Sequence, residues 1–259
     1  MKVNLVALLI GAGFGFVLVA ARLNEYDTIH RMLLLEEFDV FDGYIVLAER
    51  AGGLPRLRVI RLSDGTQRTV AFEDAAYDAG LEKNPELRSR AFRFYYASPI
   101  VPHSIYEYDL QTGKQRLLKQ DQVLGGYDPK RYEVRRLAAP APDGARVPIS
   151  LVFRKGLRQD GKNPLLLCGY GAYGSTEVCR PGFEPERISL LDRGFVYAIA
   201  HVRGGQELGR AWYEDGKLLH KKNTYSDFIA CAEYLIARRY TDPGKLFANG
   251  LSAGGMLMA

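Results

Sequence analysis

The pattern of apolar residues changes near Pro164, and this change limits the fold more than any other feature of the sequence. Before it, short stretches of alternating apolar and polar residues are separated by turn sequences, which is typical of antiparallel β-structure. After it, continuous apolar runs alternate with segments of helical periodicity, which indicates parallel strands with helices on the faces of the sheet. The sequence therefore predicts an all-β segment followed by an α/β segment.

Turn sequences divide the first segment into hairpins. Asp42-Gly43 separates EEFDVF from YIVLAER, Ser63-Asp64-Gly65 separates RLRVIRL from TQRTVAF, and Gln111-Thr112-Gly113 separates SIYEYDL from KQRLL. Residues 62–68 (LSDGTQR) and 110–116 (LQTGKQR) share Leu, Gly, Gln and Arg at matching positions. A strand–turn–strand unit that recurs every ~40–50 residues suggests propeller blades, with unrelated hairpins in a sandwich as the alternative. Residues 78–89 (DAGLEKNPELRS) are expected to form a short helical connection.

The second segment follows a junction, residues 120–163, that contains several prolines and a hairpin signal at Asp143-Gly144. The expected strands are LLLCGYG, FVYAIAHV and KLFANG. One predicted helix, ERISLLDRG, ends at Gly194. A second, at residues 224–239, places five apolar side chains on one face: Phe228, Cys231, Ala232, Leu235 and Ile236.

Composition excludes some classes of function. The net charge is +5, but the Lys and Arg residues are scattered among acidic residues and form no basic run, which argues against a nucleic-acid surface. The three cysteines, Cys168, Cys179 and Cys231, lack CxxC spacing, which argues against a disulfide framework or a zinc site and fits a reducing compartment. The sequence implies no metal and no cofactor.

Residues 3–21 carry no charge and lie between Lys2 and Arg22. About 20 apolar residues suffice to cross a bilayer as a helix. A secretory signal with a cleavage site near Val19-Ala20-Ala21 is an alternative. A buried glycine-rich segment and an incorrectly assigned start of the chain also remain open.

Gly250-Leu251-Ser252-Ala253-Gly254 matches the pattern G-x-S-x-G, with an apolar run before it and a helical start after it. A nucleophilic serine has to project from a sharp turn, so the flanking residues have to be small. The sequence predicts Ser252 as the nucleophile of a hydrolase. The backbone N–H of Ala253 is expected to be one donor to the oxyanion.

The second oxyanion donor is expected on an earlier loop. CGYGAYG follows the first apolar run of the α/β segment, and the Tyr170 hydroxyl is the candidate. HVRGGQELG lacks the spacing of a phosphate loop and is expected to be a tight exit from a strand. The α/β-hydrolase order of serine, acid and histidine needs a histidine after Ser252, but all four histidines precede it. His201 is the alternative base.

These motifs together resemble the prolyl oligopeptidase family, in particular its oligopeptidase B branch. The α/β segment carries LLLCGYGAYG, ISLLDRGFVYAIAHVRGG, WYEDGKLLHKKNTYSDF and GLSAGG, and the first segment carries GLPRLRVIRLSDG and VPHSIYEYDLQTG. The resemblance runs from about residue 33 to residue 259. It implies the last blades of a β-propeller at 33–130, and an α/β-hydrolase fold at 131–259 that stops after the nucleophile elbow; residues 1–22 match neither.

The resemblance also implies a cytoplasmic serine peptidase that cleaves short peptides after Arg or Lys, with the propeller excluding folded proteins. Ser252, Tyr170 and Ala253 match the nucleophile and the oxyanion donors, and Tyr173 matches a position lining the pocket for the residue before the scissile bond. The catalytic Asp and His and the acids that bind the basic side chain would follow residue 259, so the chain is expected to be an inactive fragment.

The chain departs from the family pattern at several positions. Cys168 stands where a tyrosine is usual, and Leu251 where a glycine is usual. The stretch STEVCRPGFEPE offers Glu177 and Glu184 in place of the expected aspartates, with plain surface charge as the alternative. An esterase or lipase, and a non-catalytic binding module tethered to a membrane by residues 3–21, are the competing functions.

Overall fold

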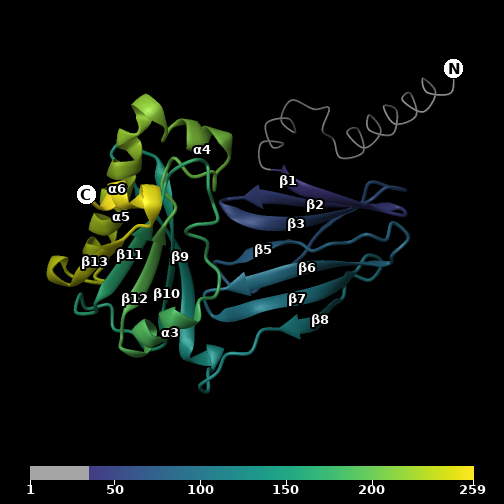
Figure 1. The fold of residues 1–259 in the computed structure, drawn as a ribbon, viewed down its shortest axis with the longest axis horizontal. Helices are drawn as coiled ribbons and strands as arrows, with labels where there is room; N and C mark the ends of the chain where they lie inside the picture. Colours follow the sequence, from purple (N-terminus) through teal and green to yellow (C-terminus); the bar gives the residue numbers. More distant parts are fainter. Residues whose placement is uncertain (1–34) are drawn as a thin grey trace.

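The computed structural model describes residues 35–259, so the apolar stretch 3–21 lies outside the described residues. Two four-stranded sheets precede one five-stranded sheet with helices (Figure 1). In residues 35–259, no helix is both long and apolar enough to span a bilayer.

Each of the first two sheets is an antiparallel meander, as expected of a propeller blade. The first blade consists of β1 (Leu35–Phe41), β2 (Tyr44–Ala51), β3 (Leu54–Arg61) and β4 (Gln67–Thr69). The second consists of β5 (Asp78–Leu81), β6 (Ala91–Ser98), β7 (Val101–Asp109) and β8 (Gln115–Gln120). The hairpin turns predicted at Gly43, Gly65 and Gly113 are confirmed, and each of these glycines has a positive φ.

The two similar turn sequences occupy equivalent places, between the third and fourth strand of each blade. Arg68 Nη1 in the first turn region donates to the Gln111 carbonyl oxygen in the second at 2.7 Å. The blades share one aromatic core in which Phe41 and Val59 of the first blade pack with Phe92 and Phe94 of the second. Stacking of blades through such a core is what the repeat predicts.

The helical connection predicted at 78–89 is wrong. Residues 78–81 form strand β5, which pairs with β6, and the following residues are irregular. Gly80 permits this pairing because a Cβ there would lie 2.6 Å from the ring of Tyr95. Pro85 lacks a backbone N–H, so it cannot support a helix interior. Tertiary pairing overrides the polar, helix-like composition of the segment.

The five-stranded sheet has the order β13-β11-β12-β10-β9. Its parallel part is β11 (Leu165–Gly169), β12 (Val196–Ala200) and β13 (Leu246–Asn249). The hairpin predicted at Asp143-Gly144 is confirmed as β9 (Tyr132–Pro140) and β10 (Arg146–Arg154), but it is an antiparallel extension of this sheet rather than a junction. A 3₁₀ turn, Pro129–Arg131, leads into β9.

Helices cover both faces of this sheet. On one face Phe228, Cys231 and Leu235 of α5 (Lys222–Ala237) pack on Leu151 and Leu167, as the predicted apolar face requires. On the other face, Leu191 of α3 (Pro185–Asp192) packs on Val152. The short helices are α4 (Arg210–Glu214) and α6 (Gly255–Met258), with 3₁₀ turns at Leu218–His220, Pro243–Lys245 and Ser252–Gly254.

Polar contacts join the blades to the α/β part of the chain. Arg136 Nη2 of β9 donates to the Gly52 carbonyl oxygen at 2.6 Å. Arg50 Nη2 donates to Thr176 Oγ1 at 3.1 Å. The predicted domain boundary at residues 130 and 131 stays a prediction; it lies between the last blade strand, β8, and the first strand of the five-stranded sheet, β9.

Candidate active site

Ser252 lies in a strained turn between β13 and α6. Its φ is +52°, in the left-handed region that non-glycine residues rarely adopt, and Ser252 is exposed to solvent. Gly250 has to be small because a Cβ there would lie 2.1 Å from the Gly254 carbonyl oxygen. This is the geometry of a nucleophile elbow, in which a sharp strand-to-helix turn lifts the serine above the sheet.

Tyr170 lies directly beside this elbow. A Cβ on Gly254 would be 2.8 Å from the Gly169 carbonyl oxygen and 3.3 Å from Tyr170 Cδ2. The Tyr170 residue is 8% exposed, so it is held in place by its neighbours. The structure therefore places Tyr170 against the turn that carries Ser252 and Ala253, although Tyr170 is far from this turn in the sequence.

Tyr173 lies on the same loop as Tyr170 but is in a different environment. It is 80% exposed and has a φ of +58°. Positive φ in a non-glycine residue costs energy and persists only where surrounding contacts hold the backbone. The loop after β11 thus carries one buried and one exposed tyrosine. It lies at the same end of the parallel strands as the turn with Ser252, because β11 and β13 run parallel.

His201, the alternative base for Ser252, is engaged elsewhere. Its Nε2 lies 2.8 Å from Ser150 Oγ, and its Nδ1 lies 3.6 Å from Glu207 Oε1. The histidine is 2% exposed and Glu207 is 6% exposed. Both ring nitrogens therefore face these buried groups and not Ser252.

Within residues 35–259, no side-chain hydrogen bond involves the Ser252 hydroxyl. A serine hydroxyl needs an adjacent base to be a strong nucleophile. Over the same range, no three His, Cys, Asp or Glu side chains gather closely enough to hold a metal ion.

Glu177 and Glu184, the candidate stand-ins for substrate-binding acids, are each paired with an arginine. Glu177 Oε2 accepts from Arg180 Nη1 at 3.0 Å, and Glu184 Oε2 lies 3.0 Å from Arg187 Nη2. Arg180 also lies 3.5 Å from Asp78 of the second blade. The charges of these glutamates are therefore partly compensated within the chain.

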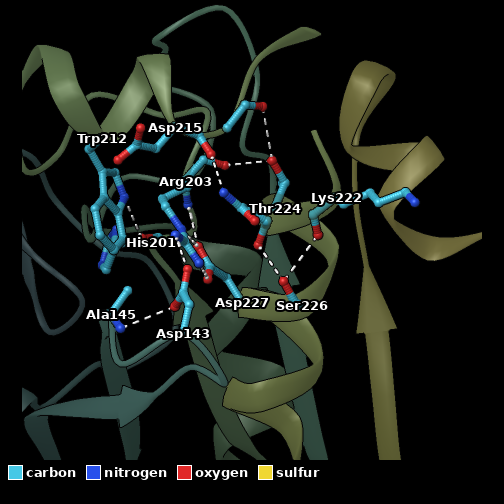
Figure 2. Close-up of polar contacts among 12 residues, drawn as sticks. Asp143, Ala145, His201, Arg203, Trp212, Asp215, Lys222, Thr224, Ser226 and Asp227 are labelled. Atoms are coloured by element: carbon cyan, nitrogen blue, oxygen red, sulfur yellow. Dashed lines mark hydrogen bonds and ion pairs between the residues drawn. The ribbon is translucent and has the colours of Figure 1, made fainter. Parts of the chain in front are cut away.

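A buried ion pair that the sequence reasoning missed joins Arg203 to Asp227 (Figure 2). Arg203 follows β12, and its Nε and Nη2 donate to the two carboxylate oxygens of Asp227 at 2.9 and 2.6 Å. Asp227 lies on α5 and is 0% exposed. A signal was available: a single acid on the face of a helix that periodicity predicts to be buried requires a charged partner.

Two family models match this chain, one over the two blades and one over much of the α/β part. The model for the prolyl oligopeptidase N-terminal beta-propeller domain matches residues 29–121, and the model for the prolyl oligopeptidase family matches residues 181–259. The chain belongs to the prolyl oligopeptidase family. The predicted fold, propeller blades followed by the start of an α/β-hydrolase domain, is confirmed by these matches and by the structure.

Curated relatives in the family cover most of the chain. Dipeptidyl aminopeptidase BI of Pseudoxanthomonas mexicana is 47% identical over 227 residues, which are 87% of this chain and 31% of that protein. Protease 2 of Moraxella lacunata is 37% identical over 86% of this chain and 32% of its own length. The chain thus spans about a third of the length of these relatives.

Solved structures agree with this placement in the family. Oligopeptidase B from Leishmania major matches with a TM-score of 0.77 and 38% identity, over 86% of this chain and 32% of that one. Oligopeptidase B from Trypanosoma brucei, solved with covalently bound antipain, matches with the same TM-score and 39% identity, over the same fractions.

Proposed function

We propose that the protein containing this chain is a serine peptidase that cleaves short peptides through an acyl-enzyme intermediate. Ser252 is the nucleophile, and the Tyr170 hydroxyl and the Ala253 N–H stabilise the oxyanion. The observation that carries the proposal is the strained elbow at Ser252, with Tyr170 packed against it. Tyr173, exposed on the same loop, is proposed to line the pocket for the residue before the scissile bond.

In this mechanism the Ser252 hydroxyl gives its proton to a general base and attacks the scissile carbonyl carbon, which becomes tetrahedral while its oxygen becomes an oxyanion. The C–N bond then breaks as the amine leaves with that proton, and water hydrolyses the acyl-enzyme. Donors that are fixed before the reaction stabilise this charge without reorganising, and loss of one such donor costs ~10²–10³ in kcat. Since no histidine bonds to Ser252 within residues 35–259, the general base is proposed to be supplied by a residue outside this range. The α/β-hydrolase order of serine, acid and histidine leads us to expect this base after Ser252, where residues 253–259 contain no histidine, so we expect residues 1–259 without it to be inactive.

Cleavage after Arg or Lys is the proposed specificity, on the similarity to protease 2 and to the oligopeptidase B structures. Release of dipeptides from the amino terminus is a second candidate. It is favoured by the 47% identity to a protein named dipeptidyl aminopeptidase BI. The two differ in whether a free α-amino group must lie two residues before the scissile bond.

The test uses the full-length protein with two fluorogenic peptides that end in the same Arg–coumarin bond. One is a dipeptide with a free amino group, and the other is a longer peptide with a blocked amino group. Cleavage of the blocked peptide supports endopeptidase action, and exclusive cleavage of the free dipeptide supports dipeptide release. Ser252→Ala is expected to lower kcat by at least ~10⁴-fold with either substrate.

Unchanged turnover by Ser252→Ala would contradict the proposed nucleophile. A protein that hydrolyses a simple p-nitrophenyl ester but neither peptide would indicate an esterase instead. A protein that binds peptides without hydrolysing them would indicate a binding module.

A further inference from the structure

The loop after β12, residues 203–205, lies in direct backbone contact with the loop that carries Tyr170. The Gly204 carbonyl oxygen accepts from the Gly174 N–H at 2.9 Å. A Cβ on Gly204 would lie 2.1 Å from the Gly171 carbonyl oxygen, and a Cβ on Gly171 would lie 2.9 Å from the Arg203 carbonyl oxygen. Since no side chain separates the two loops, a displacement of the first has to displace the second.

A third backbone segment, at Gly216, also contacts the loop at 203–205. A Cβ on Gly216 would lie 2.1 Å from Gly204 N. Thr224 Oγ1, at the start of α5, is hydrogen-bonded to the Arg203 carbonyl oxygen at 2.8 Å and lies 3.2 Å from that of Gly216. Lys221 Nζ donates to the Gly171 carbonyl oxygen. The backbone next to Tyr170 is therefore held both by the loop at 203–205 and by Lys221.

The Arg203 side chain fixes this arrangement to the rest of the fold (Figure 2). Its backbone N–H and its Nε both donate to Asp227 Oδ2 at 2.9 Å, and its Nη2 donates to Asp227 Oδ1 at 2.6 Å. Its Nη1 donates to Asp143 Oδ2, in the turn between β9 and β10. One planar guanidinium thus joins the loop at 203–205, helix α5 and the β9–β10 turn.

The chemistry of this contact is specific to arginine. A guanidinium presents donors in a fixed planar fork that matches a carboxylate, whereas a lysine ammonium is a point charge on a flexible stem. The Arg203 side chain is 6% exposed and that of Asp227 is 0% exposed, so water cannot replace a lost contact there. Lysine at position 203 would keep the charge but would lose the geometry that orients the loop.

We infer that Arg203, clamped by Asp227 and Asp143, is a positioning residue that holds the Tyr170 oxyanion donor in its catalytic place. This inference rests on the proposed function, because it assigns Arg203 a role in the reaction proposed for Ser252 and Tyr170. Arg203 acts through the chain of contacts from its carbonyl oxygen and Gly204 to Gly171, and it does not touch the substrate.

The experiment measures kcat and KM of the full-length protein carrying Arg203→Lys, with Tyr170→Phe in the wild-type and in the Arg203→Lys background. Arg203→Lys is expected to lower kcat ~10- to 100-fold, the range caused by a small misplacement of a catalytic group. KM should stay within about twofold, because the contact acts on the transition state and not on ground-state binding. In the Tyr170→Phe background the same substitution should lower kcat by less than about threefold, because the donor is already absent.

The matched control is Arg131→Lys. Arg131 Nη2 pairs with Asp192 Oδ1 at 3.1 Å, but with both side chains more than a third exposed. Its kcat should stay within about twofold of wild type, as expected of an exposed pair. All variants are assayed well below their melting temperatures, so that loss of folded protein does not enter kcat.

If Arg203→Lys does not fold, Asp143→Asn replaces it, since this acid is half exposed and its loss removes only one contact of Arg203. Asp143→Asn should then lower kcat in the wild-type background, though less than Arg203→Lys would. In the Tyr170→Phe background it should lower kcat less than in wild type.

Equal kcat for Arg203→Lys and wild type would overturn the inference, as would decreases that multiply fully with those of Tyr170→Phe. If Ser252→Ala keeps its activity, the proposed function itself fails. If Ser252→Ala is inactive and Arg203→Lys has wild-type kcat, only the positioning role fails.

Discussion

Replacing Gly204 by alanine tests the close backbone contact directly. Gly204 has a φ of +98°, and a Cβ there would lie 2.1 Å from the Gly171 carbonyl oxygen and 3.1 Å from that of Gly216. An unfavourable φ costs ~1–3 kcal/mol. Overpacking against groups that cannot rotate away costs a further ~1–3 kcal/mol. Gly204→Ala is therefore expected to destabilise the protein by about 2–6 kcal/mol in total.

Gly194→Ala is the matched control for the backbone strain. Gly194 has a φ of +85°, and nothing lies within 4 Å of its Cβ position. This variant should therefore show only the ~1–3 kcal/mol that an unfavourable φ costs. The difference in the free energy of unfolding between the two variants therefore gives the cost of the steric overlap with the Tyr170 loop.

The assay is urea unfolding of the full-length variants, with kcat measured on the folded proteins. Gly204→Ala should unfold at lower urea than Gly194→Ala, and its kcat should fall while that of Gly194→Ala is unchanged. Equal unfolding midpoints for the two variants would refute the claim that the loops are in unyielding contact.

Two further predictions concern titration. Burial raises the pKa of the Cys179 thiol to about 12, so alkylation of Cys179 by iodoacetamide at pH 8 should be slow in the folded protein and fast in urea; mass spectrometry that finds equal rates would contradict this. The hydrogen bond from Arg203, followed by that from the Ala145 N–H, lowers the pKa of the Asp143 carboxyl. A carboxyl with a depressed folded-state pKa stabilises the fold fully above its unfolded value of ~4, and this contribution is lost as the pH falls through the folded value. Asp143→Asn should therefore flatten the acid side of the stability–pH profile, and parallel profiles for the two proteins would count against the contact.

Local signals predicted most of the elements correctly. The glycine turns at Gly43, Gly65 and Gly113 were found from their dipeptides and tripeptides, because positive φ is a property of a few neighbouring residues. The apolar face of α5 was predicted from the helical spacing of its apolar residues, which is also a property of one short stretch of sequence. The sharp turn at Ser252 was predicted because both its small residues and its flanking strand are local, whereas the role of Ser252 as nucleophile stays a prediction.

Where the sequence reasoning failed, a distant partner decided the structure. Residues 78–81 form a strand because β6 lies beside them, with Gly80 accommodating the ring of Tyr95. The β9–β10 hairpin was recognised, but its place in the α/β sheet depends on its pairing with β12. His201 was only the alternative base, and its contacts with Ser150 and Glu207, which engage both ring nitrogens, could not be read from the sequence.

The amino-acid sequence by itself determined the two kinds of sheet, the blade repeat and the serine elbow, since each follows from turn chemistry or periodicity within a short window. Only the tertiary structure decided that the loops after β11 and β12 touch through Gly171 and Gly204, and that Arg203 meets Asp227. The physical reason is that both contacts join segments that are separate in the chain. Their geometry exists only after the strands have paired and α5 has packed on the sheet.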